Sequence, residues 1–480
     1  MFSFYSIKDY HGSLLHGNIQ CIDAVQFYLD AINANSHLNA FIEVYAEEAL
    51  ARATQLDADR KAGKPLGKLH GVVVGLKDVI SYKDHKLSAA SKILEGFTSI
   101  YDATATRRLL QEGAIIIGRQ NCDEFAMGSS NENSAYGVVV NAADNSRVPG
   151  GSSGGSAVAV QAGLCMISLG SDTGGSVRQP ADFCGIVGLK PSYGRISRYG
   201  LIAYASSFDQ IGIFSRTVED VALILEVIAG TDEYDSTVME EKVPEFSKEL
   251  TSENKKIKVA YFKQSIENEA LDAEIAASIN GFIKKLTNET IEVQAIDFEL
   301  LDYIVPTYYV LTTAEASSNL SRYDGVRFGH RTPDKNVDLT QFYKQSRSEA
   351  FGKEVQKRIL LGTFVLSTGY FDAYYTKAQQ VRRLLMEKVA SVFQEYDVII
   401  MPTVPTTAFK IGEKTNDPIA MYLADIYTVF ANLTGIPAIS IPLFRHSNGM
   451  PFGLQVHSAA GNEVTLLRFS KLAEQVNKGL

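Results

Sequence analysis

The spacing of apolar residues changes along this chain, and the changes predict where helices and strands lie. In residues 1–65, apolar positions such as Ala24, Tyr28 and Ile32 recur at intervals of three and four, which predicts a helical N-terminal part. From residue 70 the pattern becomes short β-branched runs, at 71–76 and 114–118, with a helical stretch at 105–112 between them. Strands are therefore expected to begin near residue 70.

The second half alternates between the two kinds of pattern. Strands are predicted at 256–262, 291–298, 396–401 and 438–441, and helices at 270–286 and 463–476. This alternation indicates an α/β fold with a largely parallel sheet covered by helices on both faces. The charged segment 231–256 has little apolar pattern, so we expect a surface excursion there and not a domain boundary. The prediction is one domain spanning residues 1–480.

Composition and charge exclude several classes of protein. The chain has 480 residues, with 46 Lys and Arg against 55 Asp and Glu, and 45% of its residues are hydrophobic. These values exclude a disordered or fibrous chain. The net charge of −9 argues against this chain holding nucleic acid by itself, because phosphate contacts need clustered Lys and Arg.

The sequence also bears on location. We expect no membrane span, because no run of 18 uncharged apolar residues occurs, and residues 1–12 lack the pattern of a signal peptide. The four cysteines are far apart, which disfavours a disulfide framework. A cytoplasmic protein is therefore expected.

Motifs for metals and phosphates do not occur in the sequence. There is no CxxC pair and no HExxH pattern, so a metal site is not expected. The Gly- and Ser-rich segment 150–156 lacks the GK[ST] ending of a P-loop, and no GxGxxG occurs there. We expect no cofactor in this chain.

Residues 128–156 show no periodicity and predict a long loop, a feature usually associated with function. Positions 150–154 match GxSxG, which would make Ser152 the nucleophile of a hydrolase elbow. An elbow needs a strand before the serine, and residues 144–149 do not have the pattern of one. A flexible linker is a further interpretation, although the small residues of 157–162 predict a packed helix after the loop.

A second cluster, at 170–176, follows an apolar stretch at 164–169 that predicts a strand. A tight turn ending in Gly174, Gly175 and Ser176 would leave backbone N–H groups beside a hydroxyl, which suits an oxyanion hole. The plain alternative is a glycine turn with a capping serine. A serine nucleophile needs a base, and lysine can serve when burial lowers its pKa. Lys77 ends the strand predicted at 71–76, although position alone favours an amine that reaches solvent.

Two long motifs, at 147–156 and 170–181, resemble the signatures of the amidase signature family. The resemblance implies that family's fold, with a large mixed sheet covered by helices and a signature core at 70–215. It also implies a triad of Ser176 as nucleophile, Ser152 as bridging serine with a cis peptide bond, and Lys77 as base. The oxyanion hole would be formed by backbone N–H groups of Thr173, Gly174, Gly175 and Ser176.

Further stretches, at 123–134, 184–191 and 314–325, resemble the amidase subunits of tRNA-dependent amidotransferases. This implies a glutaminase that supplies ammonia for converting Glu-tRNA(Gln) to Gln-tRNA(Gln), in a heterotrimer with subunits B and C. ATP and Mg²⁺ would be used by the partner subunit. Two alternatives remain, which are a stand-alone amidase acting on small amides and a scaffold subunit without activity.

The resemblance also places glutamine recognition on particular residues. Arg358 would hold the carboxylate and Asp425 the ammonium group, with Tyr309 and Ser130 lining the same pocket. A planar guanidinium suits a carboxylate because it can form two parallel bonds. The alternative is that Arg358 and Asp425 are ordinary surface charges on two helices.

Overall fold

The structure is a computed structural model, which describes residues 2–250, 256–414, 421 and 424–479. Within these residues an 11-stranded sheet runs through the molecule in the order β1-β3-β2-β4-β6-β5-β10-β11-β9-β7-β8. The strands are β1 Phe41–Val44, β2 Val73–Lys77, β3 Ile115–Gln120, β4 Ile167–Asp172, β5 Val187–Lys190, β6 Gln210–Ser215, β7 Ile257–Phe262, β8 Ile291–Ile296, β9 Val398–Pro402, β10 Ala438–Arg445 and β11 Pro451–Ser458.

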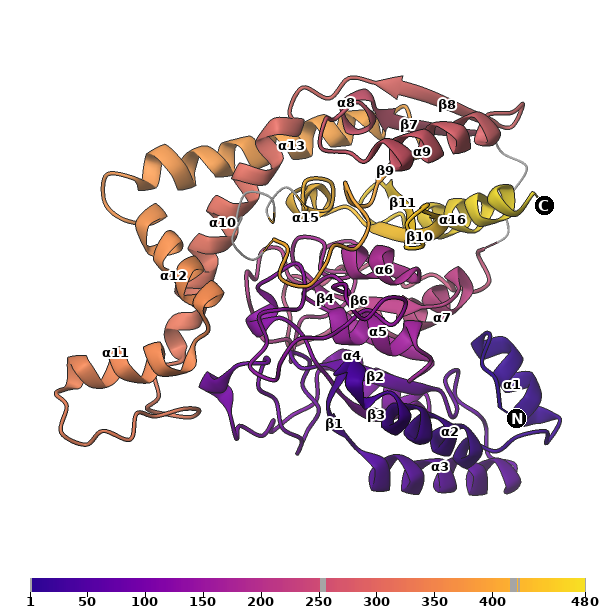
Figure 1. The fold of residues 1–480 in the computed structure, drawn as a ribbon. Helices are drawn as coiled ribbons and strands as arrows, with labels where there is room; N and C mark the ends of the chain where they lie inside the picture. The colour runs from indigo at the N-terminus through magenta and orange to yellow at the C-terminus, as the bar shows by residue number, and fades with distance from the viewer. Residues whose placement is uncertain (1, 251–255, 415–420, 422–423, 480) are drawn as a thin grey trace.

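Helices cover both faces of this sheet (Figure 1). In the first half they are α1 Ile7–Leu15, α2 Cys21–Ala34, α3 Ala46–Lys61, α4 Thr104–Gln111, α5 Gly154–Gln161, α6 Arg178–Cys184 and α7 Val218–Ile228. In the second half they are α8 Lys263–Ile266, α9 Ala273–Leu286, α10 Ile304–Asn319, α11 Leu339–Ala350, α12 Lys353–Val365, α13 Lys377–Val392, α15 Val429–Thr434 and α16 Glu463–Lys478.

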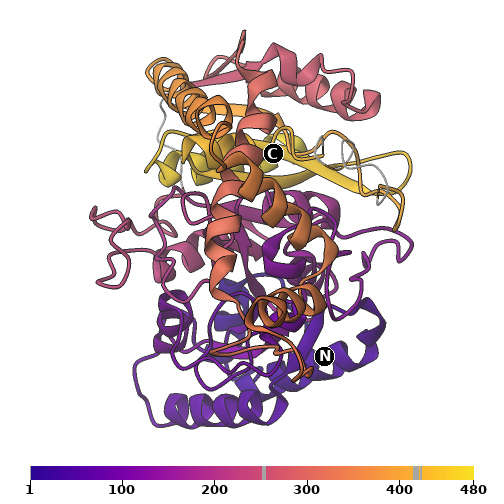
Figure 2. The same cartoon turned by 90° about the vertical axis from the view of Figure 1, so that its left-hand side faces the viewer.

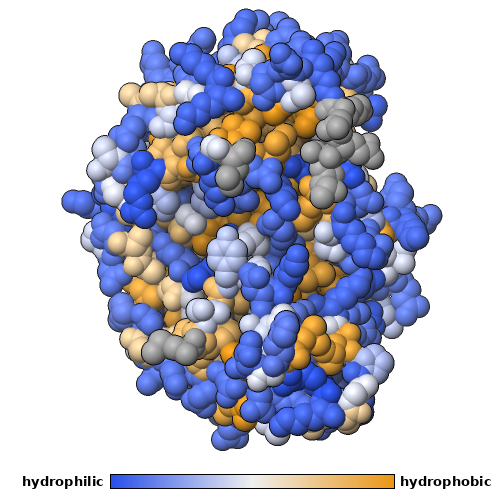
Figure 3. Space-filling model, turned by 90° about the vertical axis from the view of Figure 1, so that its right-hand side faces the viewer, coloured by the Kyte–Doolittle hydropathy of each residue, from blue (hydrophilic) through white to orange (hydrophobic). Residues whose placement is uncertain are grey.

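The N-terminal elements and the strands β7 and β8 lie at opposite ends of the sheet (Figure 1). Helices α10, α12 and α13 pack together along one flank, where Figure 2 shows them in front of the sheet. The opposite flank is largely hydrophilic, with scattered apolar patches (Figure 3). Among the described residues, no helix is long and apolar enough to cross a membrane.

The sheet is mixed, so the prediction of a largely parallel sheet is wrong and the mixed sheet of the resemblance is confirmed. Strand β2 pairs in parallel with β3 and β4, and β7 with β8 and β9. Antiparallel pairs join the centre, from β4 through β6, β5, β10 and β11 to β9. Strands β5, β6 and β11 were not predicted from the alternating pattern. Without those strands the antiparallel connections could not be detected.

Several local predictions agree with the structure. The apolar runs at 71–76, 114–118, 164–169, 256–262, 291–298, 396–401 and 438–441 each overlap a strand, and those at 105–112, 157–162, 270–286 and 463–476 each overlap a helix. Residues 1–65 are not wholly helical, because β1 lies within them and pairs antiparallel with β3. A four-residue edge strand gains its hydrogen-bond partner only in the folded sheet, which is why the sequence pattern did not reveal it.

The segment 231–256, predicted as a surface excursion, is described except for residues 251–255. Residues 231–250 form no helix or strand, and most of their side chains are exposed or half-buried. Phe246 and Leu250 are buried, however, so two apolar side chains attach this segment to the core. Residues 251–255 lie outside the described part of the chain. The division of the chain into a single domain stays a prediction.

Candidate active site

Lys77 lies at the carboxyl end of β2, and its side chain is 0% exposed. The apolar residues before it lead the chain into the sheet between β3 and β4, so the amine cannot reach solvent. The interpretation from position alone is therefore wrong. Burial lowers the pKa of Lys77 to about 8, because the charged form is poorly solvated there. A part of the lysine population is then neutral near neutral pH.

Three serine hydroxyls surround the Lys77 amine. Its Nζ donates to the Oγ atoms of Ser152 at 2.7 Å, Ser153 at 2.9 Å and Ser171 at 2.9 Å. Charged lysine has three N–H donors, whereas the neutral amine has two donors and one lone pair. The neutral amine can therefore donate to two of these hydroxyls and accept a proton from the third.

The hydrogen bonds leave Ser152 and Ser171 as the two hydroxyls that can donate to the neutral amine. Ser153 Oγ donates to the backbone carbonyl of Ser171 at 3.1 Å, so its single proton is already engaged. Within the described residues, the hydroxyls of Ser152 and Ser171 have no hydrogen-bond partner other than Lys77. Of these two, Ser152 is the bridging serine that the family resemblance implies. Ser153 and Ser171 were not predicted as site residues, although each lies within a Gly- and Ser-rich motif.

The loop that carries Ser152 is held closely by its surroundings. The peptide bond between Gly151 and Ser152 is cis, as the resemblance implies. A Cβ atom on Gly151 would lie 2.2 Å from Asp123 Oδ2 and 2.7 Å from the backbone nitrogen of Ser130, so only glycine fits there. Residues 148–153 form no strand and lead directly into α5, which excludes the strand that a hydrolase elbow needs.

Ser176 lies between β4 and α6, and it is 8% exposed. The Ser153 N–H donates to the Ser176 carbonyl at 3.3 Å, which brings the two serine-rich motifs together. Gly175 N–H donates to Asp172 Oδ1 at 2.8 Å, so this amide is already engaged. The N–H groups of Thr173, Gly174 and Ser176 have no turn or loop hydrogen bond within the described residues. These three remain as candidate oxyanion donors.

A buried ion pair shapes the backbone around Ser176. Arg178 Nη2 donates to Asp172 Oδ1 at 2.9 Å and Nε donates to Oδ2 at 3.1 Å, and both side chains are fully buried. Burial alone would raise the pKa of Asp172, but the Arg178 guanidinium lowers it to about 2. The carboxylate also accepts the N–H groups of Gly175 and Val177. The Asp172 carboxylate therefore holds the turn through the residue before Ser176 and the residue after it.

Arg358 and Asp425 are both buried, at 4% and 7% exposed, so they are not ordinary surface charges. Tyr309 connects them: its hydroxyl donates to Asp425 Oδ2 at 2.8 Å, and the Arg358 guanidinium lies 5.6 Å from its ring centre. Arg358 also donates to the hydroxyl of Tyr204 at 2.7 Å and to Glu354 Oε1 at 2.8 Å. The structure thus brings three of the four predicted pocket residues together.

The pocket residues adjoin the loop of Ser176. Thr428 follows Asp425 by one turn, and its hydroxyl donates to the Gly174 carbonyl at 2.7 Å. A Cβ atom on Gly174 would lie 2.3 Å from the hydroxyl of Tyr308, the neighbour of Tyr309. Burial raises the pKa of Asp425 to about 6, while hydrogen bonds from Tyr309 and Ser129 oppose the shift. Asp425 is therefore mostly ionised at neutral pH.

Ser129, which was not predicted from the sequence, contacts Asp425. Its hydroxyl donates to Asp425 Oδ2 at 2.9 Å. Ser130 is buried next to it, and its hydroxyl has no hydrogen-bond partner within the described residues. The two serines follow each other in the loop before the signature motif, and the sequence carries no sign of which one faces the pocket. A role for Ser130 in substrate binding stays a prediction.

Residues 23–467 match the Amidase family. The chain belongs to this family. The A subunit of the glutamyl-tRNA(Gln) amidotransferase of Koribacter versatilis (strain Ellin345) is 51% identical over 451 residues, which cover 94% of each chain. The protein of the same name from Prosthecochloris aestuarii (strain DSM 271 / SK 413) is 47% identical over 476 residues, covering 99% of each chain.

Solved structures of amidase-family proteins share the fold. The A subunit of the glutamyl-tRNA(Gln) amidotransferase from Thermotoga maritima superimposes with a TM-score of 0.79 at 37% identity, covering 98% of this chain and 94% of that one. The peptide amidase of Stenotrophomonas maltophilia superimposes with a TM-score of 0.83 at 27% identity, covering 99% of this chain and 97% of that one. Both comparisons extend over nearly the whole chain.

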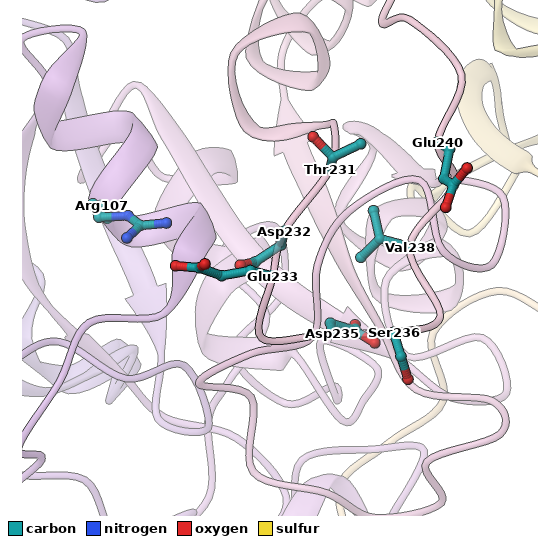
Figure 4. Close-up of a pocket in the computed structure, with 8 residues that line it drawn as sticks. All are labelled: Arg107, Thr231, Asp232, Glu233, Asp235, Ser236, Val238 and Glu240. Carbon is teal, nitrogen blue, oxygen red and sulfur yellow. The ribbon is translucent and has the colours of Figure 1, made fainter.

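Other features of this amidase-family chain lie apart from the triad. Within the described residues, no group of three or more His, Cys, Asp or Glu side chains is arranged to hold a metal ion, and the four cysteines are buried and unpaired. A cavity of about 460 Å³, shown in Figure 4, is lined by Arg107 and by residues of the 231–240 segment. None of its lining residues belongs to the triad or to the predicted glutamine pocket.

Proposed function

We propose that this chain is the amidase subunit of a glutamyl-tRNA(Gln) amidotransferase, which hydrolyses glutamine and supplies the ammonia. The observation that carries the proposal is the fully buried Lys77 amine, held by three hydroxyls beside the loop of Ser176. The name shared by relatives that are about half identical over nearly the whole chain supports the same assignment.

In the proposed acylation step, Ser176 Oγ attacks the side-chain carbonyl carbon of glutamine. The Ser176 proton passes to Ser152 Oγ as the Ser152 proton passes to neutral Lys77, whose pKa near 8 suits a base at neutral pH. The tetrahedral oxyanion would accept hydrogen bonds from the free N–H groups of Thr173, Gly174 and Ser176. Preorganised donors of this kind stabilise charge that develops only in the transition state.

Collapse of the tetrahedral intermediate breaks the carbon–nitrogen bond. The proton held by Lys77 returns through Ser152 to the leaving nitrogen, and ammonia departs from a glutamyl ester of Ser176. Water then attacks this ester with the same two groups as proton acceptors, and glutamate leaves. The sum is glutamine plus water giving glutamate plus ammonia, and the free enzyme is restored.

The proposed glutamine pocket uses one basic and one acidic side chain. Arg358 Nη1 and Nε are engaged by Tyr204 and Glu354, whereas Nη2 makes no hydrogen bond within the described residues and can take the α-carboxylate. Asp425 is ionised at neutral pH and would hold the α-ammonium group. An enzyme of simple amides would gain nothing from burying Asp425, because such a substrate has no ammonium group to pair with it. Arg358 would keep its ion pair with Glu354.

We further propose a heterotrimer with subunits B and C in the cytoplasm. The partner subunit would bind Glu-tRNA(Gln) and use ATP and Mg²⁺ to activate the glutamate, and the ammonia would pass to it from this chain. The net charge of −9 supports this division, because a strongly acidic chain is a poor ligand for tRNA phosphates.

Purification of the chain from its own cells, followed by a glutaminase assay with and without the accompanying proteins, tests the proposal. We expect co-purifying subunits, and glutamate formation that is far faster with glutamine than with a small amide such as propionamide. A chain that purifies alone and prefers propionamide would instead be the stand-alone amidase of the same family.

A further inference from the structure

Glu124 belongs to neither the triad nor the glutamine pocket, yet its side chain is only 3% exposed. One carboxylate oxygen, Oε2, accepts the backbone N–H of Gly352 at 2.8 Å. The other, Oε1, accepts the hydroxyl of Ser91. Gly352 is the residue before α12, so Glu124 caps this helix from a distant part of the chain.

Helix α12 carries the residues that orient the basic side of the pocket. Glu354 lies in its first turn, and Glu354 Oε1 accepts the Nε–H of Arg358 at 2.8 Å. With a rise of 1.5 Å per residue, Arg358 lies about 9 Å along the axis from Gly352. In its ionised form, Glu124 also interacts favourably with the helix dipole. Any shift of this end of the helix therefore moves Glu354 and, through it, the Arg358 guanidinium.

The loop 123–133 that contains Glu124 also contacts the loop of Ser152. Asp123 Oδ2 and Oδ1 accept the N–H groups of Asn131 at 2.9 Å and Asn133 at 3.0 Å, which closes the loop on itself. The same carboxylate lies against Gly151, where a Cβ atom would be 2.2 Å from Oδ2. Ser129, later in the loop, donates to Asp425. One short loop thus contacts the bridging-serine loop, helix α12 and the acid of the pocket.

We propose that Glu124 is a positioning residue that sets glutamine affinity by fixing Arg358 relative to Ser176. The inference rests on the proposed function, because it assumes that Arg358 holds the substrate carboxylate. Glu124 touches no reacting atom, so its loss should weaken glutamine binding and leave the chemistry of the triad unchanged.

The glycine partner offers a test that leaves the carboxylate in place. Gly352 has a φ of −68°, which any residue adopts, but a Cβ atom there would lie 2.3 Å from Glu124 Oε2. Gly352→Ala therefore pushes the Glu124 carboxyl group away from the Gly352 N–H and breaks the same hydrogen bond without changing Glu124. Glu124→Ala removes the acceptor, and Glu124→Gln keeps an acceptor oxygen of the same reach without the charge. Gly281→Ala is the control, because a Cβ atom on Gly281 in α9 meets nothing within 4 Å.

The measurement is glutamine hydrolysis by the assembled complex, with KM and kcat determined separately. Burial raises the pKa of Glu124 to about 7, so this carboxyl group is only partly ionised at neutral pH. Loss of its hydrogen bond to Gly352 predicts that Glu124→Ala and Gly352→Ala each raise KM about threefold to hundredfold, with kcat nearly unchanged. Because both break one contact, the double variant should match the single ones. Glu124→Gln should recover most of the loss, and Gly281→Ala should behave as the wild type.

A second measurement separates positioning from general damage. Phosphonylation of Ser176 by a small fluorophosphonate needs the triad but has no amino-acid group, so its rate should be unchanged in every variant. The inference is overturned if Gly352→Ala leaves the glutamine KM unchanged, or if it slows phosphonylation as much as it weakens glutamine use. If Glu124→Ala does not fold, the KM values of Gly352→Ala and Glu124→Gln test the inference in its place. A wild-type complex that reacts with the fluorophosphonate but forms no glutamate from glutamine would instead refute the proposed function.

Discussion

Lys77 must be neutral to accept a proton, so the pH dependence of glutamine hydrolysis follows from its environment. Burial lowers the pKa of Lys77 to about 8. With that value, the neutral fraction is about one in eleven at pH 7 and about ten in eleven at pH 9. We therefore expect kcat to rise about tenfold between pH 7 and pH 9, and to fall as the pH drops through 8.

The pH dependence of glutamine binding should show a second transition, separate from that of kcat. Burial raises the pKa of Asp425 to about 6, and the protonated acid cannot pair with the α-ammonium group. Thus KM for glutamine should rise as the pH falls below 6, while the kcat limb stays near pH 8. Two limbs about two pH units apart would distinguish the base from the binding acid.

The assay is glutamate release between pH 5 and pH 9 at constant ionic strength, with the glutamine concentration varied so that kcat and KM are obtained separately. Lys77→Arg should be inactive throughout, because the guanidinium stays protonated. Lys190 is the necessary control, since it is also fully buried and burial lowers its pKa to about 7. The limb should remain in Lys190→Met. A wild-type kcat that is flat from pH 7 to pH 9, or an active Lys77→Arg variant, would refute the assignment of the base.

Three further predictions concern the pocket, the nucleophile loop and metals. Asp425→Asn should weaken glutamine use by about 2–5 kcal/mol, because it removes a desolvated charge pair with the α-ammonium group, and it should leave fluorophosphonate labelling unchanged. Equal losses in both measurements would indicate a structural role for Asp425. Gly175→Ala should lower kcat by at least about tenfold in steady-state assays, because Gly175 has a φ of +125° and an added Cβ atom would lie 2.3 Å from Thr428 Oγ1. Near-normal turnover of this variant would show that the loop tolerates movement. Chelators should leave glutamine hydrolysis unchanged, and loss of activity together with a bound metal would contradict this.

Local sequence patterns predicted the parts of the fold that depend on neighbouring residues. The runs that became β2 and β4 and the Gly- and Ser-rich motifs at their ends were visible, because strand propensity and turn chemistry are local. The burial of Lys77 was not, because it depends on β3 and β4 closing around the strand. The antiparallel centre of the sheet was missed for the same reason, since strand orientation is set by chain connections.

The candidate site shows the same division. The motif resemblance indicated Lys77, Ser152 and Ser176, but it did not indicate which serines surround the amine. Ser153 and Ser171 are neighbours of Lys77 only because two loops meet at the end of β2. Ser153 lies in the first Gly- and Ser-rich motif and Ser171 in the second, so the sequence could have indicated them as candidates.

The Ser176→Ala variant of the assembled complex tests the central claim most directly. Only the supply of ammonia from glutamine is assigned to Ser176, so amidation of Glu-tRNA(Gln) with glutamine should be abolished. Amidation with added ammonium salt, ATP and Mg²⁺ should continue at the wild-type rate. If an intact Ser176→Ala complex loses both activities to the same extent, or keeps its glutamine-dependent activity, the assignment of ammonia supply to Ser176 is contradicted.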